Sequence, residues 1–156
     1  MLFDVKKYTT PDPEKVDLNK TKANVGVFLT AYFSARERVG QPREPKVTAS
    51  YSLVPPSTKI SGFEAENILI EKEEAMEEYY QLSNLFSKGY AAIQHPFKSD
   101  ISQRRKKIFM DRYVRGYSIF EVAQRSHISE YLVSTESNKI IIQFASALEL
   151  VVFSND

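Results

Sequence analysis

Few residues in this chain of 156 could carry out catalytic chemistry. The chain has no cysteine, which excludes disulfides, thiolate metal sites and cysteine nucleophiles. Its two histidines, His95 and His127, do not stand at a spacing typical of metal ligands, and neither a glycine-rich phosphate loop nor a nucleophile elbow is present. The glutamates of residues 64–78 provide paired carboxylates, but no apolar pocket is expected around them that would raise a carboxyl pKa for acid–base catalysis. We therefore predict that the protein is not an enzyme and uses neither a cofactor nor a metal.

A second set of residues has the chemistry of nucleic-acid recognition. Serine, threonine and asparagine can donate or accept hydrogen bonds at base edges, and tyrosine can also contact a thymine methyl group. Lysine and arginine contact phosphates and supply the salt-dependent part of DNA affinity. The predicted base-reading residues are Ser129, Glu130, Tyr131, Ser134, Thr135 and Asn138. The predicted phosphate-contacting residues are Arg104, Arg105, Lys106, Lys107, Arg115, Arg125 and Lys139.

The distribution of charge favours a nucleic-acid partner more than the total charge does. The chain has 21 basic and 20 acidic residues, which give a formal net charge of +1. Seven acids and one base lie at 64–78, whereas eight bases and three acids lie at 97–125. The acidic stretch is either a solvated helix face or a contact surface for a basic partner. The basic stretch is either a solvated helix face or a surface that binds phosphates.

A short capped helix and a second capped helix are predicted to position these residues. Ser118 begins a capping box ahead of a helix at 119–126, and His127 lies in the tight turn that follows. Ser129 then begins a second capped helix, which no glycine or proline interrupts up to Phe153. In a helix-turn-helix, the first helix braces across the phosphate backbone and the second places its N-terminal side chains at base edges in the major groove.

The rest of the chain is predicted to be mainly α. Apolar residues at helical spacing indicate helices at 18–39, 63–94 and 100–115, the second of them bent near Gly89. Residues 40–62 hold four of the seven prolines and predict an extended, proline-rich connector. The predicted organisation is a flexible arm at 1–17, an N-terminal helix and extended segment at 18–62, an acidic helical segment at 63–96 and a helix-turn-helix DNA-binding region at 97–156.

Several features of the sequence predict the cellular compartment of the protein. No run of 18 apolar residues is present, so we expect no membrane span. The charges and prolines of the first fifteen residues are atypical of a secretory signal. Together with the lack of cysteine, these features predict a cytoplasmic protein.

The sequence resembles two known groups of proteins. The C-terminal half resembles region four of bacterial sigma factors through Glu121-Val122-Ala123, Ile128-Ser129 and Val133. The whole chain resembles the ArpU family of phage-encoded late transcriptional regulators, whose relatives include RinA-like and LtrC-like activators. Three blocks carry the second resemblance: residues 21–25 with 28–32, residues 45–52 with 55–57, and residues 108–113 with 121–129 and 143–145.

This resemblance implies a sequence-specific regulator that activates late promoters. Its partners would be double-stranded promoter DNA and bacterial RNA polymerase, and it would be associated with the nucleoid of a bacterial host. The family's DNA-reading positions fall on the six base-reading residues named above. The chain departs from the family at Ser126-His127, where members often carry Leu-Gly, and at Glu130-Tyr131-Leu132, where they tend to have starts rich in serine and arginine. His127 then occupies a turn position where a positive φ is common.

Two other classes of function stay open. One is an interaction adaptor that contacts polymerase or a repressor without binding DNA, consistent with the acidic run and with the glutamates Glu130 and Glu136 on the second helix. The other is a small-terminase-like packaging subunit, which also uses a helix-turn-helix and forms rings. The apolar tail at 140–153 fits either core packing or a homodimer interface.

Overall fold

The computed structural model describes residues 2–45 and 63–155, with side chains described for 2–45 and 71–155. The predicted extended connector and the second block of family resemblance therefore lie largely outside the described residues. The chain forms two compact units, Met1–Gly26 with Lys88–Asp156 and Val27–Ser87. We call them the α6 unit and the α2–α3 unit. The described residues are mainly α-helical, which confirms the predicted fold class.

The two units differ from the predicted organisation because two helices pass from one unit into the other. Helix α2 (Leu18–Arg38) confirms the helix predicted at 18–39, and its last residues lie in the α2–α3 unit. Helix α3 (Phe63–Ala91) begins in that unit and ends in the α6 unit. No helix in the described part of the chain is long and apolar enough to cross a membrane.

The α2–α3 unit is built around stacked aromatic rings and one buried arginine. Tyr32 of α2 stacks on Phe86 and Tyr79 of α3, with ring centroids 4.5 and 6.5 Å apart. Arg36 is 1% exposed and donates to the hydroxyl oxygens of both tyrosines and to the carbonyl oxygen of Pro42. These hydrogen bonds satisfy a charged group that would be costly to bury alone, and they attach the chain after α2 to the two helices.

The acidic run lies at the surface of α3 wherever its side chains are described. Glu78 pairs with exposed Arg38 at 2.7 Å, and Glu77 accepts a hydrogen bond from Gln81 one turn later. The exposed glutamates are Glu71, Glu73, Glu74, Glu77 and Glu78. This placement fits a solvated helix face, and the alternative of a contact surface stays a prediction.

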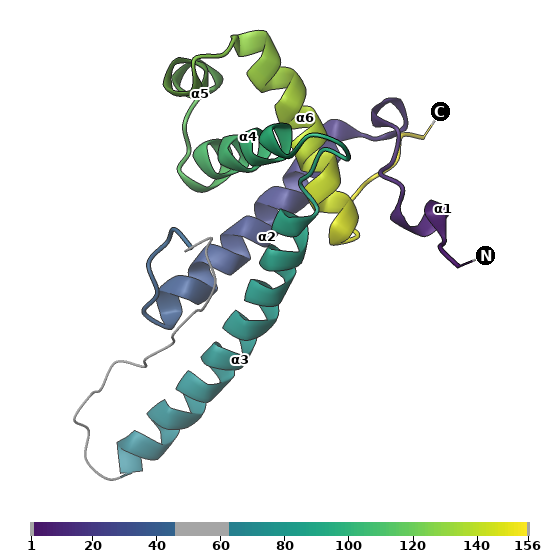
Figure 1. Cartoon of the computed structure of the whole chain (residues 1–156). Coiled ribbons are helices and arrows are strands. Elements are labelled where there is room, and N and C mark those ends of the chain that lie inside the picture. The colour runs from purple at the N-terminus through teal and green to yellow at the C-terminus, as the bar shows by residue number, and fades with distance from the viewer. Residues whose placement is uncertain (1, 46–62, 156) are drawn as a thin grey trace. The chain divides into compact units, whose positions relative to one another are not determined.

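The α6 unit gathers its shorter helices around α6. In Figure 1, α4 lies beside α6, and α5 lies near the N-terminal end of α6. The residues of α6 that face the core are apolar except for Glu136 and Ser137, and the ring of Phe144 stacks on that of Phe109 at a centroid distance of 4.9 Å. The elements of this unit besides the start of α2 and the end of α3 are α1 (Val5–Tyr8), η1 (Pro13–Lys15), α4 (Ser99–Phe109), the π-turn η2 (Met110–Val114), α5 (Ile119–Ser126) and α6 (Glu130–Ala147).

Helix α6 ends at Ala147, so the prediction of an uninterrupted helix to Phe153 is wrong. Glu149 adopts a φ of 59°, and the amide of Leu150 donates to the carbonyl oxygen of Ala145 at 2.8 Å. These features form a Schellman motif, which ends a helix. The tail then forms an isolated antiparallel bridge between Phe153 and Val16. The apolar tail thus packs within its own chain, and it attaches the end of the segment predicted as a flexible arm.

Gly89 has a packing role that its sequence context did not indicate. Helix α3 continues through Gly89 to Ala91, and a Cβ at Gly89 would lie 2.5 Å from an atom of the Phe144 ring. By contrast, a Cβ at Gly26 in α2 would meet nothing within 4 Å. The two glycines therefore form a matched pair for a test.

Replacing these glycines by alanine is expected to change stability in opposite directions. Gly26→Ala should raise the free energy of unfolding by about 1 kcal/mol, because alanine favours the helix. Gly89→Ala should lower it by about 1–3 kcal/mol, because the buried ring must move away. Urea unfolding of both variants measures the difference, and a stabilised Gly89→Ala variant would contradict this packing.

Candidate nucleic-acid interface

The first helix of the predicted helix-turn-helix has the caps that the sequence indicated. The Oγ of Ser118 accepts from the amide of Glu121 at 3.1 Å, which satisfies one of the free donors at the start of α5. Val122 and Ala123 face the core. The helix ends where His127 adopts the left-handed conformation, with φ 55° and ψ 43°. The prediction of a capped helix at 119–126 followed by a turn at His127 is confirmed.

The second helix, α6, follows directly. The Oγ of Ser129 accepts from the amide of Leu132 at 3.0 Å and caps the helix. Val133 in its first turn is fully buried and anchors the helix start to the core. Two capped helices joined by a tight turn make the helix-turn-helix arrangement, in which the start of the second helix is free to enter a groove.

The left-handed turn gives a test of this geometry. A side chain in the left-handed region is strained, so His127→Gly should raise the free energy of unfolding by about 1 kcal/mol. Gln124→Gly, at an exposed position inside α5, should lower it by about 1 kcal/mol. Thermal or urea unfolding compares the two variants, and a destabilised His127→Gly variant would show that the turn is not left-handed.

Most of the predicted base-reading residues share the outer face of α6. At 100° per residue, positions 131, 134, 135 and 138 lie on one side of the helix, while the buried positions 133, 136, 137 and 140 lie on the other. Tyr131 is 81% exposed, and Ser129 and Glu130 are also exposed at the helix start. Ser134, Thr135 and Asn138 are partly exposed. The structure thus presents all six residues around the exposed side of the first half of α6.

Thr135 is already engaged within the helix. Its Oγ1 donates to the carbonyl oxygen of Tyr131 at 2.8 Å. The hydroxyl oxygen keeps its capacity to accept, so Thr135 suits a base that donates, such as the amino group of cytosine or adenine.

The predicted phosphate-contacting residues differ in how far they reach solvent. Arg105 is 7% exposed, and its Nη1 donates to the carbonyl oxygen of Gln94 at 2.7 Å. Its Nε donates to Oε2 of Glu136 at 2.6 Å. The assignment of Arg105 to phosphate is therefore wrong, because its guanidinium faces the interior. Arg104, Lys106, Lys107, Arg115, Arg125 and Lys139 are partly or fully exposed.

Neighbouring rings and carboxylates hold several of the exposed cations in place. Arg125 lies over the ring of Tyr117, 4.5 Å from its centroid, and Lys106 lies over the ring of Tyr90 at 5.3 Å. Such cation–π contacts orient a charged group without neutralising it. Arg115 pairs with the buried carboxylate of Asp111, so its charge is partly compensated.

Two residues that matter in this region were missed or misread from the sequence. Glu136, expected on the recognition helix as a charge opposing Lys139, is 4% exposed and paired with Arg105. Tyr113 of η2 was not among the predicted site residues. Its hydroxyl oxygen accepts from Nη1 of Arg112 at 3.4 Å, and burial raises the pKa of that hydroxyl. The signal for Glu136 was its spacing from Val133 and Ile140, which places it on the buried side of the helix.

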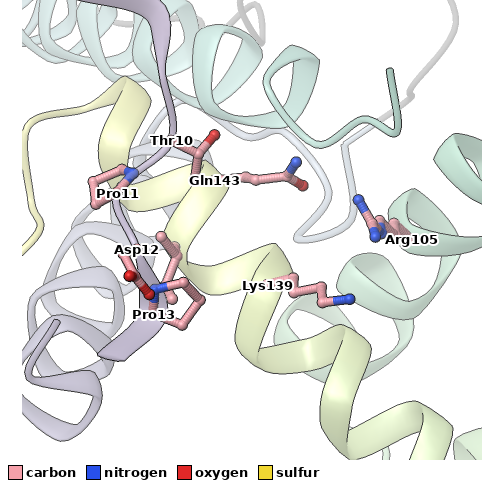
Figure 2. A pocket seen from close by; sticks show the side chains of 8 residues that line it. Thr10, Pro11, Asp12, Pro13, Arg105, Lys139 and Gln143 are labelled. Atoms are coloured by element: carbon pink, nitrogen blue, oxygen red, sulfur yellow. The ribbon is translucent and has the colours of Figure 1, made fainter. Parts of the chain in front are cut away.

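A pocket of about 300 Å³ is lined by the N-terminal segment, α4 and the second half of α6. Figure 2 shows the N-terminal segment passing along one side of it, with Arg105 and Lys139 on the other. Its lining residues are Thr10, Pro11, Asp12, Pro13, Arg105, Lys139, Ile142 and Gln143. Within the described residues, no group of three histidine, aspartate or glutamate side chains could hold a metal ion.

The fold and this surface define a mainly α chain with a helix-turn-helix arrangement. Over 133 residues the chain is 26% identical to a protein of Listeria innocua named uncharacterized phage-related protein Lin1259/Lin1739, and the alignment covers 85% of this chain and 89% of that protein. No protein-family model matches the chain, and neither does any solved structure. The similarity supports a phage origin.

Proposed function

We propose that the chain is a phage-encoded transcriptional regulator that binds promoter DNA through α5 and α6. In this proposal it activates late genes, as the resemblance to the ArpU family implies, and contacts bacterial RNA polymerase in the cytoplasm at the nucleoid. It acts by binding and not as an enzyme. The observation that carries the proposal is the outer face of α6, where hydrogen-bonding side chains surround the exposed start of a capped helix.

The arrangement of charge supports the same proposal. The α6 unit contains fifteen lysines and arginines against eleven acids, whereas the α2–α3 unit contains six against nine. Lys107 of α4 and Arg125 of α5 are both exposed in the α6 unit. Because Glu136 is buried, the outer face of α6 carries fewer exposed acids than its sequence suggests. A polyanion would thus meet a favourable field beside the reading helix.

The proposed mechanism divides the work between the two helices. Helix α5 lies across the phosphate backbone and supports the first turn of α6 in the major groove. Cations of α4 and α5 contact phosphates and set the position of the protein along the duplex. Ser134, Thr135, Asn138 and Tyr131 then meet base edges, where hydrogen bonds and a thymine methyl distinguish one sequence from another.

The salt dependence of binding to an unrelated duplex tests the proposal. We expect the wild-type affinity, measured by fluorescence anisotropy, to fall linearly with the logarithm of salt concentration. In the variant Lys107→Gln/Arg125→Gln the magnitude of that slope should be smaller by about 2, because each phosphate contact contributes about 0.9 to it. Lys22→Gln, which removes an exposed charge outside the proposed interface, should leave the slope unchanged.

Anisotropy and gel filtration together separate this proposal from the two alternative functions. An adaptor would not bind the duplex at any salt concentration, and a packaging subunit would elute from gel filtration as a large ring. Arg105 is left out of the neutralised set, because its loss would leave Glu136 buried without its main partner. An unchanged slope in the double variant would show that this surface is not the interface.

A further inference from the structure

Glu136 is a buried carboxylate on the inner side of the proposed reading helix, and three cations converge on it. Arg105 of α4 donates to both of its oxygens, at 2.6 and 3.4 Å. Arg104 of α4 and Lys139 of α6 each lie 3.9 Å from one of these oxygens. The side chain of Glu136 is 5% exposed, whereas those of Arg104 and Lys139 are 33% and 50% exposed.

The cluster is unbalanced in charge. A buried carboxylate is stable when it is paired and hydrogen-bonded, and Arg105 alone fulfils that requirement. Arg104 and Lys139 are held at the longer distance, and both retain exposed surface. These four side chains carry a formal charge of +2, and the carboxylate of Asp12, which lines the same pocket as Arg105 and Lys139, offsets only one of those charges. An external anion at this point would complete the cluster.

The position of Glu136 connects this cluster to base reading. Glu136 directly follows Thr135 and lies two residues before Asn138, on the opposite side of the helix. Arg105, which holds Glu136, also donates to the carbonyl oxygen of Gln94 in the segment before α4. Charged hydrogen bonds from α4 therefore hold the inner side of α6 beside its buried apolar residues, and their geometry is more directional than that of apolar packing.

We infer that Glu136 is a positioning residue for DNA recognition. Through Arg105 it fixes the rotation of α6, and it holds Arg104 and Lys139 so that both contact the phosphate backbone of the DNA that α6 reads. This inference rests on the proposed function. Figure 2 shows Lys139 and Arg105 extending toward each other from α6 and α4, as two cations of one cluster would.

The variant Glu136→Gln tests the inference by whether its affinity for DNA rises or falls. If Glu136 were only one more acid near a polyanion, its removal would strengthen binding to every duplex. A positioning role predicts instead that affinity for the target site falls at least ten-fold. Affinity for an unrelated duplex should fall less, because it loses only the held phosphate contacts of Arg104 and Lys139 and does not depend on the rotation of α6. Glu121→Gln, which removes an exposed acid of α5, is the matched control and should strengthen binding to both duplexes slightly.

A second variant separates positioning from loss of folding. The double substitution Arg105→Met/Glu136→Leu replaces the buried ion pair by an apolar pair, an exchange that commonly retains stability. We expect its thermal unfolding midpoint to stay near that of the wild type and its affinity for the target site to stay at least ten-fold weaker. Wild-type affinity for the target site in either this variant or Glu136→Gln would overturn the inference.

Hydrogen exchange tests the fixed rotation of α6 without DNA. The backbone amides of residues 137–141 should exchange at least ten-fold faster in Glu136→Gln than in Glu121→Gln. Equal protection would overturn the inference whether or not the chain binds DNA. If wild-type protein binds no duplex but Glu136→Gln still exchanges faster, the proposed DNA-binding function is wrong. The anchoring of α6 by Glu136 would then still hold.

Discussion

Replacement of Ser134, Thr135 and Asn138 together by alanine is expected to remove the preference of the chain for its target sequence and to leave its affinity for unrelated duplexes unchanged. Each base contact in a groove contributes about 1–3 kcal/mol of discrimination. Three lost contacts should therefore lower the ratio of specific to unspecific affinity by at least about 100-fold. The three residues are partly exposed, and alanine favours a helix, so α6 should stay folded.

A mobility-shift competition between the target site and a scrambled duplex measures this ratio. Ser146→Ala, near the other end of α6, is the matched control and should keep the wild-type preference. Each single alanine variant should lose part of the preference, with the largest change at the base that its side chain contacts. An unchanged preference in the triple variant would contradict the assignment of the outer face of α6 as the reading face.

The second large effect is expected in the core of the α6 unit. Phe144→Ala should lower the free energy of unfolding by about 3–5 kcal/mol, because the site cannot fully collapse around the cavity that is left. Phe144 is fully buried, stacks on Phe109, and fills the space beside Gly89. Since the proposed reading face lies on the same helix, DNA binding should weaken as the folded population falls.

Urea unfolding monitored by circular dichroism measures this loss. Phe97→Ala is the matched control, because Phe97 is 90% exposed and its truncation should change stability by no more than about 0.5 kcal/mol. A loss below about 1 kcal/mol in Phe144→Ala would contradict the packing around α6.

The helix starts of the recognition region could be predicted from the sequence because their causes are local. Ser118 and Ser129 lie within three residues of the amides they cap, and apolar residues at helical spacing fix which side of each helix is buried. A tight turn at His127 was likewise indicated by the short distance between the two helices, and its positive φ by the resemblance to a family whose members often carry glycine at this position. The exposed face of α6 proposed to read DNA follows from the same spacing, since its residues lie opposite Val133 and Ile140.

The end of α6 could not be predicted in this way, because its cause is distant in sequence. No glycine marks the left-handed residue at Glu149, and the tail is held by the segment around Val16, where the amide of Asp17 donates to the carbonyl oxygen of Val152. The packing role of Gly89 was missed for a similar reason. Its partner Phe144 lies far along the chain and made no local signal.

The burial of Arg105 could not be predicted by counting charges along the sequence. Arg104, Arg105, Lys106 and Lys107 look alike as a run of bases, yet only Arg105 is buried among them. The difference arises from Glu136, 31 residues further along, whose carboxylate accepts hydrogen bonds from the guanidinium of Arg105. The spacing of Arg105 from Ile108 and Phe109 was the available signal, because those residues share the buried side of α4.

The central claim, that α6 reads a DNA sequence, is tested most directly by selection of binding sites from a pool of random duplexes. Wild-type protein and the triple alanine variant are each carried through the selection at moderate salt, and the retained duplexes are sequenced. We expect the wild type to enrich one short motif and the variant to retain DNA without enriching it. A wild-type pool with no motif above the starting pool, or the same motif enriched by both proteins, would contradict the claim.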